Sequence, residues 1–224
     1  MNYVRPAVRW PSGHLPAERE KSTISRRHLA SAKVSSTATH THSESAIIDG
    51  MESNLDTANR LKVYLETSFV SYLTGDVTAN AKVAADQAYT RLWWERERSK
   101  CDIFVSVYTA AEAAKGREDS ARRRIEAIDG ITLVPVVDDD VIALAGQLLE
   151  AHALPPGETT DALHIASAAV GGVDVLLTWN CRHMANPHTL PRTKEIVRAA
   201  GYHCPDIMTP KTFIENTEME ASDV

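Results

Sequence analysis

The chain has 224 residues, of which 43% are apolar and 24% charged, and it carries a formal net charge of −6. Length and composition together indicate a globular protein of about one domain. No stretch reaches the roughly 18 uncharged apolar residues of a membrane span. A pI near 5.8 argues against non-specific clamping of nucleic acid phosphates. Three scattered cysteines are too few for a disulfide framework, so we expect a reducing, cytoplasmic compartment.

The first fifty residues differ in composition from the remainder of the chain. They hold seven Lys and Arg against four Asp and Glu, a net charge of +3, which leaves −9 for residues 51–224. They show no helical or strand period, so we expect a disordered tail. A transit peptide is also rich in Arg and Ser, but Glu18, Glu20 and Glu44 argue against one. Alternatively, translation starts at Met51 and the preceding residues follow from a misplaced start site.

Beyond the tail, short apolar runs alternate with segments of helical period. In chain order we expect a strand over 62–65, helical spacing over 69–73, a helix over 80–99, a strand over 103–106, helices over 108–116 and 119–128, and a strand over 131–137. There follow helices over 138–152 and 159–170, a strand over 175–178, helices over 181–186 and 189–200, a strand near 206–208, and a terminal helix from Thr209-Pro210. This alternation predicts a three-layer α/β/α domain with a mainly parallel central sheet of four to five strands.

Several helix ends carry their own signals. Asn80 is expected to cap the long helix, whose apolar face would be formed by Val83, Ala84, Tyr89, Leu92 and Trp93. Either Asp138 or Asp139 would cap the helix that follows the third strand. Gly171-Gly172 would end the helix over 159–170, as glycine does at helix C-termini.

Oxygen-bearing side chains occur where such a sheet binds ligands, which is at the carboxyl ends of its strands. Glu66 follows the first strand directly, and Glu112 lies in the first turns of the helix after the second. Asp161 begins the helix before the fourth strand, and Asn180 lies just beyond that strand. We therefore expect these four side chains to converge.

The local sequence around these residues resembles one nuclease family. The segment 64–68, Tyr-Leu-Glu-Thr-Ser, resembles the strand followed by Asp-Thr-Ser/Asn that opens PIN-domain nucleases. The segment 161–166, Asp-Ala-Leu-His-Ile-Ala, is similar to the helix with the family's third acid, and 176–180 resembles its fourth strand with the acid or Asn that follows. Glu112 falls where the second acid is expected. Residues 61–216 thus resemble a PIN domain, close to the VapC-type toxins of bacterial toxin–antitoxin pairs.

The resemblance implies an endoribonuclease that depends on Mg²⁺ or Mn²⁺, with RNA as substrate, a cognate antitoxin as partner, and a homodimeric state. Glu66, Glu112 and Asp161 would hold the metal ion, although Glu112 could act instead as base toward the attacking water. Asn180 would complete the catalytic set through an amide hydrogen bond. Further substrate contacts are expected from Ser68, Trp179, Arg182 and His183.

Two departures from the family pattern leave an alternative open. The first acid is usually Asp and here is Glu66, while the fourth is commonly Asp and here is the neutral Asn180. Both changes reduce affinity for a cation, so a PIN-like binding module with weakened catalysis is the competing hypothesis. His164 is expected to be a core histidine that bonds a backbone group. Cys181, His183 and Cys204 lack the paired motif of a zinc site.

Overall fold

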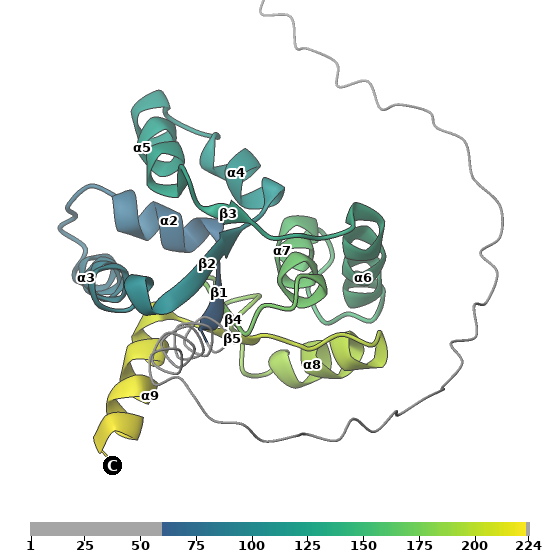
Figure 1. Ribbon diagram of the computed structural model, residues 1–224. Coiled ribbons are helices and arrows are strands. Elements are labelled where there is room, and N and C mark those ends of the chain that lie inside the picture. The colour runs from purple at the N-terminus through teal and green to yellow at the C-terminus, as the bar shows by residue number, and fades with distance from the viewer. Residues whose placement is uncertain (1–59, 223–224) are drawn as a thin grey trace, which may run out of the picture. The chain divides into compact units, whose positions relative to one another are not determined.

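The computed structural model describes residues 60–222, and these form a five-stranded sheet in which all neighbouring strands are parallel (Figure 1). The strand order is β3-β2-β1-β4-β5. The strands are β1 (Leu61–Leu65), β2 (Cys101–Val105), β3 (Thr132–Leu133), β4 (Val175–Leu177) and β5 (Asp206–Met208). The predicted α/β class with a mainly parallel sheet of four to five strands is confirmed.

The central strand β1 is buried on both faces, which is why its sequence is apolar rather than alternating. Tyr64 pairs with Phe104 of β2, and Leu65 pairs with Leu177 of β4. Because successive side chains of a strand point to opposite faces, Val63 and Leu65 pack in one core and Tyr64 packs in the other. The sheet therefore separates two hydrophobic cores.

Helices cover both faces of the sheet, as Figure 1 shows. Those of the first core are α6 (Asp138–Glu150), α7 (Thr159–Val170) and α8 (Leu190–Ala199). Those of the second are α2 (Thr67–Thr74), α3 (Ala81–Arg96), α5 (Glu118–Ile128) and α9 (Pro210–Ser222). The short α4 (Val107–Ala113) follows β2 directly. No helix within residues 60–222 has the length and apolar character needed to cross a membrane.

Three predicted elements were wrong in extent or existence. The helix predicted over 80–99 ends at Arg96 and is followed by a 3₁₀ turn, η1 (Arg98–Lys100). The strand predicted over 131–137 shrinks to two residues at the sheet edge, where Pro135 has no N–H for a ladder. The helix predicted over 181–186 is a series of turns, because the N–H groups of Met184 and Ala185 both bond the carbonyl of Asn180.

Helix caps follow the sequence with one exception. Asn80 accepts the N–H groups of Lys82 and Val83 and so caps α3, as predicted. Of the predicted apolar face of α3, Trp93 is fully buried, and Tyr89 and Leu92 are partly buried against the same core. The other buried residues of the helix are polar: Asp86, Gln87 and Thr90. The N-cap of α6 is Val137, and Asp138 is already the first helical residue. A negative charge in the first turn is favourable because it faces the positive end of the helix dipole.

The prediction of a tail or a misplaced start over residues 1–50 falls outside the described residues. At the other end of the predicted PIN-like segment 61–216, α9 continues to Ser222.

Candidate functional site

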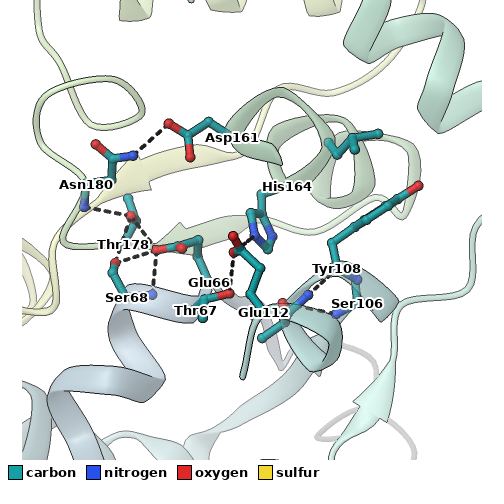
Figure 2. A network of polar contacts seen from close by, with 12 residues as sticks. Glu66, Thr67, Ser68, Ser106, Tyr108, Glu112, Asp161, His164, Thr178 and Asn180 are labelled. Carbon is teal, nitrogen blue, oxygen red and sulfur yellow. Dashed lines mark hydrogen bonds and ion pairs between the residues drawn. The ribbon is translucent and has the colours of Figure 1, made fainter. Parts of the chain in front are cut away.

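Polar side chains gather where β1, β2 and β4 end, at the carboxyl edge of the sheet. Glu66 follows β1, Ser106 follows β2 and Thr178 follows β4. The backbone N–H of Glu66 donates to the carbonyl of Leu177 at 3.1 Å, which ties the end of β1 to the end of β4. The topology therefore brings together residues that are more than 100 positions apart in the chain, as Figure 2 shows.

Glu66 is the N-cap of α2 and is only 5% exposed. Its Oε2 accepts the backbone N–H of Ser68 at 2.9 Å, the Ser68 hydroxyl, and the Thr178 hydroxyl at 2.8 Å. All three donors go to one oxygen, and no described residue donates to Oε1. Hydrogen bonds to Oε2 thus fix the carboxylate, while Oε1 has no donor among the described residues.

Glu112 on α4 repeats this arrangement with fewer donors. Its Oε2 accepts the Thr67 hydroxyl at 2.9 Å and lies 3.0 Å from Nε2 of His164 (Figure 2). The bond to His164 is the main cause that lowers the pKa of Glu112, and the bond to Thr67 adds to it. Glu112 is therefore ionised at neutral pH, with Oε1 left without a donor among the described residues.

His164 on α7 is completely buried, as expected, but the predicted backbone partner was wrong. Its Nδ1 lies 2.7 Å from the Tyr64 hydroxyl and its Nε2 faces Glu112. The signal in the sequence was the three-residue spacing from Asp161, which places both side chains on one face of α7. Tyr64 could not be recognised in the same way, because a tyrosine inside an apolar strand is an ordinary core residue.

Asp161 lies in the first turn of α7, and Asn180 lies just beyond β4, as predicted. The Asn180 amide donates to Oδ2 of Asp161 at 2.7 Å. Burial is the main cause that raises the pKa of Asp161, followed by the negative charges of Glu66 and Glu158. The negative charge of Glu66 thus acts on the Asp161 carboxyl group, which couples the two acids electrostatically.

Glu158 was missed by the sequence interpretation. Nδ1 of His183 lies 3.3 Å from Oε2 of Glu158 and 3.3 Å from Oδ2 of Asp161. The His183 backbone N–H also donates to the Asn180 amide oxygen at 3.1 Å, which closes the turn after β4 and keeps both side chains toward the start of α7. The sequence did offer a signal for Glu158, because it lies three residues before Asp161, at the N-cap of α7.

The other predicted substrate contacts are partly engaged within the protein. The Ser68 hydroxyl accepts the N–H of Trp179 at 2.7 Å and donates to Glu66. The Trp179 indole stacks on Tyr72 with a centroid distance of 5.5 Å and donates to Thr90 at 2.8 Å. Both side chains thus support the site from within, whereas Arg182 is exposed in the turn.

Two sets of side chains offer ligand atoms within 4.8 Å of one another: Glu66, Glu112 and His164, and Glu158, Asp161 and His183. In the first set the histidine is an unsuitable ligand, since both of its nitrogens already have partners. The atoms that remain are carboxylate oxygens, which are the donors that Mg²⁺ and Mn²⁺ prefer. The residues present therefore fit a hard divalent cation. Neither set contains a cysteine, so among residues 60–222 neither Cys181 nor Cys204 joins His183 in a ligand cluster.

Comparison of the sequence with protein-family models gives no match, and the curated proteins contain no significant match to it.

Proposed function

We propose that this protein is a metal-dependent endoribonuclease in which Glu66, Glu112 and Asp161 hold Mg²⁺ or Mn²⁺. One observation carries the proposal: the carboxylates of Glu66 and Glu112 are each fixed through Oε2 while Oε1 has no donor. Asp161 likewise accepts its bonds at Oδ2 alone. An oxygen that no protein group bonds is available as a ligand for a cation.

The charges of the site favour a bound cation. Two carboxylates about 4 Å apart repel by about 4 kcal/mol at an effective dielectric of about 20. The raised pKa of Asp161 reflects burial and this repulsion. A divalent cation would relieve the repulsion, orient a scissile phosphate and stabilise the charge that develops on it.

The side chains of the protein would then divide the remaining work. Glu112 is ionised at neutral pH and would hold the cation through Oε1. If Glu112 were not a ligand, the same oxygen would instead accept a proton from the attacking water. The Asn180 amide orients Asp161, and the Thr178 hydroxyl orients Glu66. Arg182 and His183 lie on the turn beside Asp161, where a phosphate of the substrate would be held.

The finer parts of the proposal rest on the resemblance of residues 64–68, 161–166 and 176–180 to PIN-domain nucleases. These parts are RNA as the substrate, a role as the toxin of a toxin–antitoxin pair, an antitoxin partner, a homodimeric state and a cytoplasmic location.

The proposal is tested by titrating the purified full chain with Mn²⁺ and Mg²⁺ in a calorimeter and then supplying RNA. Asp161→Asn is compared with Asp140→Asn, since each aspartate is the third residue of its helix and Asp140 is exposed. We expect cation binding and RNA cleavage in the wild type and in Asp140→Asn, and loss of both in Asp161→Asn. Intact RNA in all three proteins, with either metal present, would overturn the proposal.

A second function is favoured by one contact. Asn180 gives its amide to Asp161 where the resembled family commonly has a fourth acid, so the site holds one negative charge fewer. A binding module that retains RNA without cutting it is the alternative. RNA retention without any cleaved product, at saturating Mn²⁺, would favour this alternative.

A further inference from the structure

A chain of buried hydrogen bonds runs behind the candidate site and ends on Glu112. The Tyr64 hydroxyl lies 2.6 Å from the Ser106 hydroxyl and 2.7 Å from Nδ1 of His164. Figure 2 shows the last link of the chain, from His164 to Glu112. Tyr64 and His164 are 0% exposed, and Ser106 is 2% exposed. Such a buried chain is costly unless every member has a partner. Every member has one, since the partnerless buried side-chain atoms found in residues 60–222 belong to Trp93 and Arg123.

The direction of the protons along this chain follows from its two ends. The Ser106 oxygen accepts the N–H groups of Tyr108 and Thr109 as the cap of α4, so its own hydrogen is left to donate to Tyr64. The Tyr64 oxygen therefore accepts from Ser106, and the nearest acceptor left for its own hydrogen is Nδ1 of His164 at 2.7 Å, since Oγ1 of Thr109 lies farther away at 3.1 Å. At the other end the Glu112 carboxylate only accepts, which requires a hydrogen on Nε2 of His164.

We propose that Tyr64 and His164 are positioning residues that fix the neutral Nε2–H tautomer of the imidazole and thereby select which oxygen of Glu112 stays free for the metal ion. The inference rests on the proposed function for its metal and adds residues outside the ligand set. The Nε2–H group occupies Oε2 together with the Thr67 hydroxyl, so the carboxylate cannot rotate to exchange its oxygens without losing both bonds. A ligand orientation fixed in this way is typical of residues that support metal ligands from behind.

The first test is nitrogen NMR of the full chain with ¹⁵N-labelled histidine, with the His164 signals assigned by their loss in His164→Gln. We expect one pyrrole-type nitrogen at Nε2 and one pyridine-type nitrogen at Nδ1. In Tyr64→Phe the Nδ1 signal should move toward that of an unbonded pyridine-type nitrogen. Two pyrrole-type nitrogens in the wild type, or an Nδ1 signal unchanged by Tyr64→Phe, would overturn the proposal. This test requires no metal and is therefore independent of the proposed function.

The second test measures Mn²⁺ affinity by calorimetry. Tyr64→Phe should weaken binding about tenfold, as loss of a group behind a metal ligand typically does. His164→Leu should weaken binding at least as much, whereas His164→Gln, which can still donate a hydrogen to Glu112, should restore most of the affinity. Unchanged affinity in Tyr64→Phe and His164→Leu would overturn the proposal and leave the proposed function standing. Absence of Mn²⁺ binding in the wild type would count against the proposed function, and the NMR test would then decide this one.

Discussion

The two sets of clustered ligand atoms differ in how the protein treats their charge. The inner pair consists of Glu66 and Glu112. One oxygen of each carboxylate accepts hydrogen bonds, from hydroxyl and backbone groups at Glu66 and from a hydroxyl and an imidazole at Glu112. In the outer group, Glu158, Asp161 and His183, burial and neighbouring carboxylates oppose the charge and raise the pKa of Asp161. The hydrogen bond from His164 therefore favours the ionised form of Glu112, whereas burial and neighbouring carboxylates disfavour the ionised form of Asp161. The difference suggests that the inner pair defines where a cation sits and that the outer group gains most from its arrival.

The largest effect is expected from removing the best-bonded carboxylate. Glu66→Ala removes the cap of α2 and leaves the Ser68 and Thr178 hydroxyls without their acceptor, so it should lower the unfolding free energy by about 2–4 kcal/mol. Denaturation with urea measures this. Asn80→Ala is the matched control, since it removes only the cap of α3 and should cost about 1 kcal/mol. Equal losses in the two variants would show that the bonds to Ser68 and Thr178 add nothing.

The second-largest effect is expected from adding a negative charge to the outer group. Asn180→Asp removes the amide that donates to Asp161 and places a like charge beside it, so stability without divalent cations should fall by about 1–2 kcal/mol at neutral pH. Millimolar Mg²⁺ should restore it. Asn186→Asp, in the same turn but bonded only to backbone groups, should show no response to Mg²⁺. Thermal unfolding with and without the ion measures both, and a Mg²⁺ response absent from Asn180→Asp would contradict the assignment of Asp161 to the metal.

The smallest effect concerns the pH dependence of the unfolding free energy, to which Glu112 and Asp161 should contribute with opposite sign. The pKa of Glu112 is lowered from its ordinary 4.5, so its contribution to stability is complete above that value and is lost as pH falls through the lowered pKa. The pKa of Asp161 is raised from its ordinary 3.8, so its contribution is present below that value and is lost as pH rises through the raised pKa. Without metal, Glu112→Gln should therefore be less stable than the wild type at neutral pH, and Asp161→Asn more stable.

Unfolding free energies measured from about pH 3 to pH 7 test this contrast. The deficit of Glu112→Gln should shrink toward the acidic end, and the advantage of Asp161→Asn should vanish there. If both variants were destabilised in parallel, the distinction between the inner pair and the outer group would be wrong.

Much of the fold could be predicted because its signals are local. The apolar run at 175–178 marks β4, Asn80 marks the start of α3, and Thr209-Pro210 marks the start of α9. Predictions failed where local hydrogen bonding departs from a regular pattern. In the run over 131–137, Val134 still donates to the carbonyl of Val105, but Pro135 has no N–H and the strand ends. Two N–H groups share the carbonyl of Asn180, and turns replace the helix predicted over 181–186.

The same distinction holds at the candidate site. Glu66, Glu112, Asp161 and Asn180 could be proposed from the sequence, because strand ends in a parallel sheet share one edge. Glu158 was missed although its spacing from Asp161 offered a signal, whereas the link from Tyr64 to His164 could not be proposed, since the two residues lie on separate segments.

The sequence by itself determined most of the strands and helices along the chain, because periodicity over a short stretch indicates each of them. It also identified Glu66, Glu112 and Asp161 as acids near the sheet edge, because parallel strands end at the same edge. Only the tertiary structure decided which oxygen of each carboxylate is bonded and which is free. That choice depends on donors such as Thr67, His164 and Thr178, and their distances from the acids arise only when β1 pairs with β4 and α7 packs behind them.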